Sequence, residues 1–467
     1  MIKNNSFLFV LYFSLVPIIY LLGLLFYSVN CSLDMMMYAC LFVYIITLIF
    51  SIQISGIMSV YSIYLITSAF FIYDCIFISL FSDENFLNII FPVKTSFTKE
   101  TGFIFINICI LTLYFTNIAY ALCRFRKRKQ IENKYIEDKE LKKISIFILI
   151  ISIFPCLYKA YIQISFIRAN GYLSAFNGDL ERLSYPFWTA GCFIIFFAGY
   201  FLFLASKPNK REYLIFSILY LFNNFILSLK GARTPFLAAL VFVVYWWNNN
   251  YGKKVKLKKL VFLGAFVIVF TIGMENVRNG YGDGLGKQEE KRGKELLLSV
   301  LLEQTTSRAV PLTIIEKDLK YHEFPFIFSP IADIVLKKIY PSEGQSLVSA
   351  TKYNDISQVT TMYYSSKMVL FGQGLGGAFL GEMYDFGKEF GVIFLSILIG
   401  IIFALTDLHS KKYSNVMVPI YAIFISNFIM LPRSRFLGVN YNYLFLTYSL
   451  FFLIHIYRSN KKYILCS

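Results

Sequence analysis

The chain has 467 residues, of which 57% are hydrophobic and 16% are charged, and its formal net charge is +17. Apolar runs of about 20 residues recur along it, which excludes an ordinary soluble domain. The runs are also too long, and alternate too little, for the strands of a membrane β-barrel. The sequence therefore predicts an all-α fold, a polytopic bundle of membrane-spanning helices.

The apolar runs predict twelve transmembrane helices, because each is close to the roughly 20 residues that cross a hydrocarbon core of about 30 Å. In chain order they lie at residues 7–29, 36–57, 60–81, 103–123, 144–166, 187–206, 213–229, 234–249, 260–275, 390–406, 416–431 and 440–457. The boundary between the second and third spans, near Gly56 and Ser59, determines on which side of the membrane every later loop lies. The first run is too long for the core of a signal peptide, so we expect it to be a retained span.

Lysines and arginines concentrate in short loops, and their placement predicts the orientation. With the N-terminus inside, five basic segments all face the cytoplasm, namely residues 124–143, 207–212, 250–259, 409–412 and the C-terminal tail. Cytoplasmic loops of membrane proteins carry such an excess. We therefore expect a multi-pass protein of the bacterial inner (plasma) membrane, with both termini in the cytoplasm and no nucleic-acid partner.

Three parts follow from this topology. Residues 1–275 form a membrane domain with spans 1–9, residues 276–389 form a large extracytoplasmic loop, and residues 390–467 form a membrane domain with spans 10–12 and the cytoplasmic tail. Within the loop, residues 289–317 have the spacing of an amphipathic helix. A second helical piece carries Phe379 and Met383 on one face and Glu382 and Asp385 on the other.

The sequence contains no motif that predicts a metal ion or a nucleotide cofactor. The eight cysteines mostly lie in apolar runs without CxxC spacing, and the chain has three histidines. Neither a disulfide framework nor a metal site is therefore expected. Gly372, Gly374 and Gly377 spell GxGxxG, but no strand precedes them and no βαβ unit surrounds them. We interpret them as a flexible or closely packed loop.

Basic residues on the outer side run against the orientation bias and are therefore candidates for a binding site. They are Arg168, Arg182, Lys230, Arg233, Arg278, Arg292, Arg308, Arg433 and Arg435. A guanidinium group stays charged and binds phosphate oxygens in a bidentate manner, which suits a lipid-linked phosphate or diphosphate. Contact with lipid headgroups is the alternative interpretation.

Four charged residues are predicted to lie at the depth of the outer leaflet. The ninth span has about 15 apolar residues before Glu275, which form roughly 22 Å of helix. The hydrocarbon core of the membrane is about 30 Å thick, so Glu275 and Arg278 fall within its outer leaflet. Lys230 and Arg233 flank a tight turn between two spans at a similar depth. A charge there indicates a functional site facing a cavity, unless its side chain snorkels to the interface.

Acidic residues near these cations are candidates for a general base. They are Glu275, Glu323, Glu382 and Asp385, with His322 as an imidazole alternative. The sequence does not choose among them, because exposed acids are common in loops. The many aromatic side chains could stack on sugars, although in a membrane protein most of them pack in the core or face lipid.

Four segments of the second half resemble a known family. They are residues 228–240 (SLKGARTPFLAAL), 274–284 (MENVRNGYGDG), 377–400 (GAFLGEMYDFGKEFGVIFLSILIG) and 431–443 (LPRSRFLGVNYNY). In these motifs the chain resembles the oligosaccharide repeat-unit polymerases, the Wzy-type O-antigen polymerases. The first 200 residues share only the pattern of spans.

The resemblance implies a metal-independent membrane glycosyltransferase with a GT-C-like helical fold and no cofactor. Such an enzyme joins undecaprenyl-diphosphate-linked oligosaccharide repeat units, as donor and acceptor, into surface polysaccharide of the lipopolysaccharide O-antigen or capsule type. The reaction takes place on the extracytoplasmic side of the membrane. A chain-length regulator protein is a candidate partner.

The resemblance also assigns roles to residues of the matching motifs. Diphosphate binding falls to Arg233, Arg278, Arg433 and Arg435, and Lys230 joins them at the same turn as Arg233. Glu382 and Asp385 would lie near the acceptor sugar, with His322 and Glu275 as further candidates for catalysis. A departing diphosphate gains negative charge, so fixed cations in a partly dry cleft would lower the barrier.

Three other functions fit parts of the pattern. A lipid-linked oligosaccharide flippase or transporter would need charges along a central pathway and inverted repeats. The spans instead carry little charge at mid-depth beyond Asp74 and Lys159. A sensor or assembly scaffold would tolerate the loss of single outer arginines. An O-antigen ligase shares the chemistry and differs mainly in its acceptor.

Overall fold

A computed structural model describes residues 2–30, 32–81, 85–89, 95–125, 137–176, 179–251, 257–280, 305–319, 324–341, 345–364, 366–370, 374–409, 414–436, 438 and 441–466. Helices dominate these residues. The sheet found among them is an antiparallel pair of two-residue strands, β1 (Asn88–Ile89) and β2 (Thr95–Ser96). The expectation of a helical membrane fold is confirmed.

The first part of the chain forms long, mostly apolar helices. They are α1 (Ile2–Asn30), α2 (Leu33–Ser55), α3 (Val60–Ser68), α4 (Asp74–Phe81), α5 (Lys99–Phe125) and α6 (Lys139–Asn170). A π-helical turn, η1 (Ala69–Tyr73), joins α3 to α4. The break before α3 lies where the sequence predicts it. Gly56 has a φ of +86°, and the Ser59 hydroxyl caps α3 by accepting the N–H of Ser62 at 3.0 Å.

Shorter elements follow α6. They are η2 (Tyr172–Ala175), α7 (Asp179–Arg182), η3 (Phe187–Thr189), α8 (Cys192–Ala205), α9 (Lys210–Ser228), α10 (Thr234–Asn250) and α11 (Leu257–Gly280). Asn209 and Glu212 form a capping box at the start of α9, and Pro235 stands in the first turn of α10. These local signals explain why a new helix starts after each turn.

The large loop consists of short helices. They are η4 (Thr305–Arg308), α13 (Ala309–Lys317), η5 (Phe326–Phe328), α14 (Ser329–Ile339), α15 (Leu347–Lys352), α16 (Ile356–Tyr364) and α17 (Ser366–Leu370). The helix expected at 289–317 is described only from residue 305 onward. There, residues 309–314 are buried rather than spread over an outer surface, because α13 packs between α5 and α18.

The chain ends with α18 (Phe379–His409), α19 (Val418–Phe428), η6 (Leu431–Arg433) and α20 (Tyr441–Cys466). Gly387 and Lys388 interrupt the helical backbone of α18, and Lys388 has a φ of +51°. The predicted helical piece before the tenth span and that span itself are therefore one kinked helix.

All twelve predicted spans fall on helices of the structure. Seven helical stretches are long and apolar enough to cross a membrane: Phe9–Val29, Leu33–Ser55, Val60–Phe81, Lys99–Phe125, Lys139–Asn170, Phe187–Ala205 and Phe379–Leu408. Shorter apolar helices lie at Gly264–Met274, Val418–Phe428 and Tyr441–Ile456. Among the described residues the multi-pass architecture is confirmed, and the number of twelve stays a prediction.

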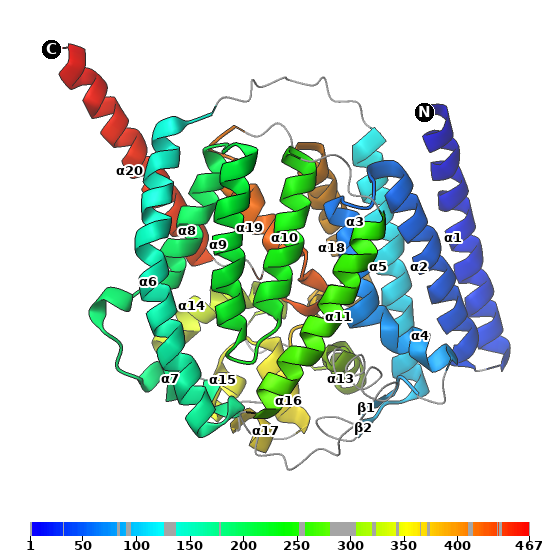
Figure 1. The fold of residues 1–467 in the computed structure, drawn as a ribbon. Helices are drawn as coiled ribbons and strands as arrows, with labels where there is room; N and C mark the ends of the chain where they lie inside the picture. The colour runs from blue at the N-terminus through cyan, green and yellow to red at the C-terminus, as the bar shows by residue number, and fades with distance from the viewer. Residues whose placement is uncertain are drawn as a thin grey trace.

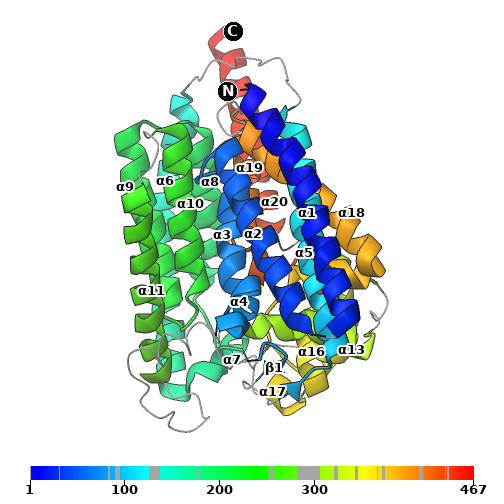
Figure 2. The ribbon, with the colours of Figure 1, turned by 90° about the vertical axis from the view of Figure 1, so that its right-hand side faces the viewer.

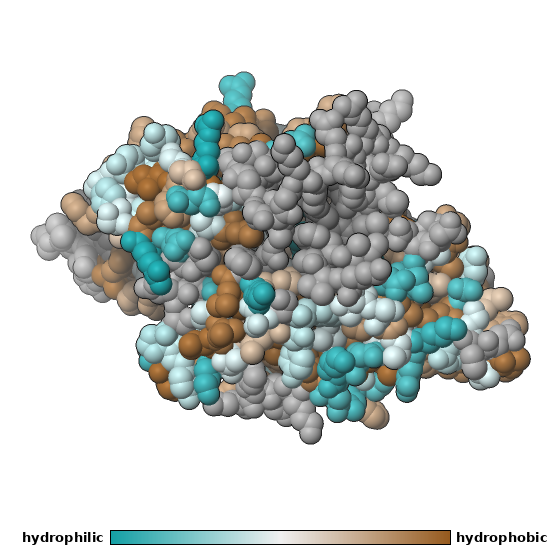
Figure 3. Space-filling view, turned by 90° about the horizontal axis from the view of Figure 1, so that it is seen from below, coloured by the Kyte–Doolittle hydropathy of each residue, from teal (hydrophilic) through white to brown (hydrophobic). Residues whose placement is uncertain are grey.

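The two ends of the chain lie at one end of the bundle, and the helices of the large loop lie at the opposite end (Figure 1). In the side view, α9, α10 and α11 form one side of the molecule, and α1, α5 and α18 lie on the other (Figure 2). The described surface of the loop end mixes hydrophilic and hydrophobic residues (Figure 3). The flanks expose large apolar side chains such as Phe154, Phe390 and Phe445.

Close packing joins α18 to α5. A Cβ on Gly400 would collide with the carbonyl oxygen of Thr116 and would lie 2.9 Å from the Cβ of Ala119. Two turns further along α18, the carboxylate of Asp407 accepts the hydroxyl of Tyr120 and the N–H of Val60, both at 2.8 Å. The absence of a side chain at Gly400 therefore lets two long helices approach each other closely.

We expect Gly400→Ala to lower the free energy of unfolding by about 1–3 kcal/mol, because a methyl group there forces α18 away from α5. Thermal unfolding of purified protein in detergent measures the change. Gly264→Ala is the matched control, since a Cβ at that helical glycine meets nothing within 4 Å. Equal stability of the two variants would contradict the packing described here.

Candidate functional site

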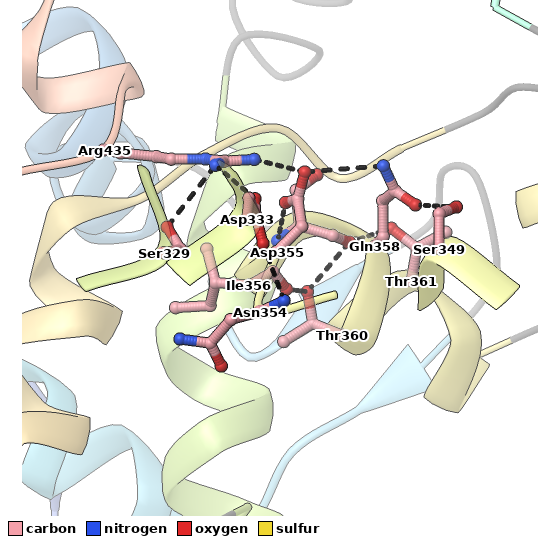
Figure 4. A network of polar contacts seen from close by, with 11 residues as sticks. Ser329, Asp333, Ser349, Asn354, Asp355, Ile356, Gln358, Thr360, Thr361 and Arg435 are labelled. Atoms are coloured by element: carbon pink, nitrogen blue, oxygen red, sulfur yellow. Dashed lines mark hydrogen bonds and ion pairs between the residues drawn. The ribbon is translucent and has the colours of Figure 1, made fainter. Parts of the chain in front are cut away.

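Arg435, in the segment after η6, binds two carboxylates of the large loop (Figure 4). Its Nη2 forms an ion pair with Asp355, just before α16. Its Nη1 lies 3.4 Å from Asp333 Oδ2 and 3.4 Å from Ser329 Oγ, both in α14. We call these four residues the Arg435 cluster. A single guanidinium group thereby joins the C-terminal segment to two helices of the loop, and its charge is balanced inside the protein.

The two aspartates of the Arg435 cluster are also fixed by backbone groups. Asp333 Oδ1 accepts the N–H of Asn354 at 2.9 Å, and Asp355 Oδ1 accepts the N–H of Ser357 at 3.0 Å. Burial raises the pKa of Asp333, although the Asn354 N–H and the Arg435 charge act in the opposite direction. Asp333 therefore depends on these two partners to remain ionised.

Two acids at the start of α18 hold other parts of the chain. Glu382 is completely buried, its Oε2 accepts the N–H of Phe436 at 2.6 Å, and its Oε1 accepts no hydrogen bond from the described residues. Asp385 is half-buried, and its Oδ2 accepts the N–H of Phe326 at 3.0 Å. The expectation that Glu382 lies on a polar face is wrong. The segment ending at Phe436 packs over this carboxylate, which supplies the acceptor that a buried N–H requires.

The backbone of residues 374–378 lies directly against η6. A Cβ on Gly377 would be 3.2 Å from the carbonyl carbon of Ser434. Gly376 has a φ of +83°, and its Cβ position lies 3.9 Å from Arg433 Nε. The interpretation as a closely packed loop is confirmed at Gly377, because a larger residue would separate the two backbones. Gly372 lies outside the described residues.

Arg308 borders a small cavity beside η1, and Arg433 contacts one of the rings that line it. The guanidinium of Arg433 lies over the ring of Phe71, 5.6 Å from its centroid. Arg308 is 8% exposed and donates to the carbonyl oxygen of Asn88 at 3.2 Å. Phe71, Arg308 and Pro432 all border the cavity, which measures about 10 Å³, close to the space of one water molecule.

Lys230 and Arg233 flank the turn between α9 and α10. The ammonium group of Lys230 lies 5.0 Å from the centroid of the Phe193 ring in α8. Arg233 is half-buried directly before α10. Lys230 therefore contacts a different element from those that Arg433 and Arg435 contact.

Three predicted site residues cannot be placed. His322 lies outside the described residues, and so do the side chains of Glu275 and Arg278, although their backbones belong to α11. Of the others, the structure brings four together around η6 and the start of α18, namely Glu382, Asp385, Arg433 and Arg435.

Sequence reasoning missed Asp333 and Asp355. Asp355 follows Asn354 directly before α16, and such residues are a signal for the start of a helix. Asp333 lies inside α14, in a pattern of ordinary helix residues, and no sequence signal marks it. Their partner Arg435 lies 80 and 102 residues away in the chain, so only the folded structure reveals the pairs.

A known protein family matches the chain over most of its length. The family described as O-antigen polysaccharide polymerase Wzy matches residues 6–462, nearly the whole chain. The chain belongs to this family. Comparisons with curated proteins and with solved structures gave no match.

Membership of the Wzy family confirms the resemblance seen in the four motifs and extends it to the first 200 residues. The protein is a multi-pass membrane polymerase of the glycosyltransferase type, which acts on lipid-linked oligosaccharide repeat units of O-antigen polysaccharide. The family match does not favour the transporter or ligase alternatives.

We expect Arg435→Met to lower the free energy of unfolding by about 3 kcal/mol, since it leaves two buried carboxylates without their counter-charge. This value is the lower end for a broken buried pair, because the Arg435 side chain is 27% exposed. Adding Asp355→Asn should recover part of the loss, as it removes one uncompensated charge. Unfolding in mixed detergent micelles measures both variants.

The matched control for this experiment is Lys388→Met. Lys388 pairs with Asp318 at 3.6 Å, and both side chains are well exposed, so the free energy of unfolding should change by less than about 1 kcal/mol. If Lys388→Met were as harmful as Arg435→Met, or if Asp355→Asn made the loss larger, the Arg435 cluster would not have the role described.

Proposed function

We propose that repeat units are polymerised at the large-loop end of the bundle, around η6 and the start of α18. One observation supports this most strongly. Arg433, predicted from sequence to bind diphosphate, lies against the glycine backbone at 374–378, where a Cβ on Gly376 would be 3.9 Å from Arg433 Nε. A guanidinium group on closely packed backbone is preorganised to bind phosphoryl oxygens, and it needs little reorganisation when a leaving group gains charge.

The proposed reaction is a displacement at the anomeric carbon of the donor glycan. A hydroxyl oxygen of the acceptor sugar forms the new bond to that carbon, and the bond from the carbon to the diphosphate oxygen breaks. The electron pair of the broken bond leaves with the polyprenyl diphosphate. The hydroxyl proton passes to a general base of the protein.

We assign the general base to Asp385. Its carboxylate is half-buried, its Oδ2 is held by the Phe326 N–H, and its Oδ1 accepts no hydrogen bond from the described part of the chain. Glu382 is a positioning residue on this proposal, because it is completely buried and holds the backbone after Arg433 and Arg435. His322 and Glu275 are the other candidates from the sequence for the general base.

On this proposal Arg435 is a positioning residue, like Glu382. Its guanidinium group binds two carboxylates of the large loop, so it holds the segment that follows Arg433. The residues proposed to bind the leaving diphosphate are then Arg433 and Arg278, from α11, and Arg233 and Lys230 would serve a separate part of the substrates.

The proposed topology has twelve spans in the bacterial plasma membrane, with both termini in the cytoplasm and residues 276–389 as an extracytoplasmic loop between two membrane domains. Two observations support it. Both chain ends lie at the end opposite the loop helices (Figure 1), and the basic loops of the sequence belong on the cytoplasmic side. Undecaprenyl diphosphate is the proposed carrier, and a chain-length regulator is a proposed partner.

We further propose a GT-C-like arrangement and a reaction that needs no metal ion. The positive charge that a metal would bring to a departing diphosphate is supplied on this proposal by arginine side chains. A polymerisation assay with purified protein and lipid-linked repeat units, with and without chelator, tests this directly. Loss of the product ladder in chelator would contradict the proposal.

We expect Arg433→Ala to abolish long-chain glycan while single-repeat lipid-linked material and protein level persist, because the leaving diphosphate loses its cation. Electrophoresis of the glycans from cells carrying the variant measures the chain length. Arg211→Ala is the matched control, since Arg211 is an exposed arginine in the first turn of α9. Normal polymer with Arg433→Ala would overturn the proposed role of Arg433.

We expect Asp385→Asn to lower turnover about 10²–10⁴-fold, the usual contribution of a general base, with an unchanged melting temperature. Asparagine keeps an oxygen for the N–H of Phe326, so the fold is retained while proton transfer is lost. Glu389→Gln, directly after the interruption of α18 at Gly387 and Lys388, is the control and should keep its activity. Full activity of Asp385→Asn would move the general base to another residue.

A further inference from the structure

Two lysines from different elements meet at one aromatic ring. The ammonium group of Lys159, in α6, lies 6.0 Å from the centroid of Phe193, and that of Lys230 lies 5.0 Å from it. Lys159 also lies 4.7 Å from the centroid of the Tyr185 ring. We call Lys159, Lys230, Tyr185 and Phe193 the lysine pair site. Aromatic faces attract cations, and here they hold two of them close together.

No carboxylate of the described residues pairs with the lysine pair site, because neither lysine takes part in an ion pair with any of them. Burial, followed by the charge of Lys159, lowers the pKa of Lys230 to about 8, while Cys192 and Cys156 act in the opposite direction. At neutral pH Lys230 still carries its charge. Two like charges in a partly dry place are costly, and a bound anion would relieve that cost.

Hydrogen bonds fix the Tyr185 ring in place. Gln163, one turn after Lys159 in α6, donates its Nε2–H to the Tyr185 hydroxyl at 3.1 Å. That hydroxyl donates in turn to the carbonyl oxygen of Leu180 at 2.9 Å. The Oε1 of Gln163 is buried and accepts no hydrogen bond from the part of the chain that the structure describes. The ring over Lys159 therefore belongs to a rigid wall, which is expected of a binding site and not of a snorkelling lysine.

The turn that carries Lys230 is fixed as well. Gly231 has a φ of +101°, and the ring of Tyr172 occupies the position that a Cβ would need. The segment containing Tyr172 also reaches the large loop, because the carbonyl oxygen of Phe176 accepts the N–H of Gln345 at 3.0 Å. A Cβ on Gly374 would lie 3.6 Å from Gln345 Nε2. Residues 172–176 thus lie between the lysine pair site and the loop that contacts Arg433.

Aromatic side chains close in sequence to Lys159 and Tyr185 are exposed. Trp188 lies beside Tyr158, with 4.9 Å between the ring centroids and 38° between the ring planes, and both are more than two-fifths exposed. Phe187 is 89% exposed and Tyr161 is 68% exposed. Exposed aromatic side chains of this kind are typical of the interfacial region of a membrane protein. An anion that arrives at the two lysines from this side is therefore one that a lipid carries.

We propose that the lysine pair site binds the phosphoryl group of a polyprenyl-linked glycan, separately from Arg433. This inference rests on the proposed function, since a polymerase handles two lipid-linked substrates in each cycle. Arg433 holds the diphosphate that leaves, and the lysine pair site holds the phosphoryl group of the other substrate. Half-buried lysines that are not neutralised by acids suit this task, because they form charge-assisted hydrogen bonds to phosphate oxygens.

The experiment measures binding of undecaprenyl phosphate to the full chain in nanodiscs of a zwitterionic lipid. The variants are Lys159→Gln, Lys230→Gln and the two combined, with Lys230→Arg as the charge-keeping variant. Lys210→Gln, an exposed lysine at the far end of α9, is the matched control. We expect a loss of affinity of about tenfold for each single change and more for both, since each charge-assisted bond contributes 1.5 kcal/mol or more.

The outcomes separate this inference from the proposed function. Unchanged affinity in the double variant, or an equal loss in Lys210→Gln, would overturn the lysine pair site. Equal weakening of phosphatidylglycerol binding would identify an unspecific headgroup site and would overturn it too. If polymer still depends on Arg433 in these cases, only this inference fails. If Arg433→Ala makes normal polymer while the lysine variants lose binding, the proposed role of Arg433 fails and the lysine pair site stands.

Discussion

Carboxylates of the large loop and of α18 accept backbone N–H groups from other segments. The acceptors are Glu316 for Thr98, Asp333 for Asn354, Glu382 for Phe436 and Asp385 for Phe326. The bond of Glu316 to Thr98, directly before α5, joins the loop helix α13 to the membrane bundle, and the bond of Asp333 to Asn354 joins α14 to the residues before α16 within the loop. Carboxylates in such places cost free energy unless they are paired. Arg435 supplies the balancing charge for Asp333 and Asp355, and the position of the site depends on it.

The membrane part of this fold could be predicted from the sequence because its physics is local. A run of about 20 apolar residues predicts a span without knowledge of its neighbours, and all twelve predicted spans fall on helices. The break at Gly56 is also local, since a glycine with positive φ and a serine cap lie next to each other in the sequence. The kink at Gly387 and Lys388 was not predicted, because it arises where α18 passes from the loop into the bundle.

The candidate site was harder to predict, since its charges depend on tertiary contacts. Arg433 and Arg435 stand two residues apart and look alike in the sequence. In the structure Arg433 lies over Phe71, whereas Arg435 pairs with two aspartates. Glu382 looks like an exposed loop acid and is completely buried. Spacing along the chain cannot distinguish a guanidinium group that lies over an aromatic ring from one that pairs with two carboxylates.

The π-helical turn η1 gives the third span a particular importance. A π turn holds one more residue than an α turn, so it changes the direction in which the following side chains point. Phe71 lies inside this turn, and its ring supports the guanidinium of Arg433. Loss of one residue from η1 would rotate the rest of that helix by about 100°. The position of Arg433, near the C-terminus, therefore depends partly on the extra residue of η1, near the N-terminus. Insertions and deletions in η1 would disturb this contact more than substitutions would.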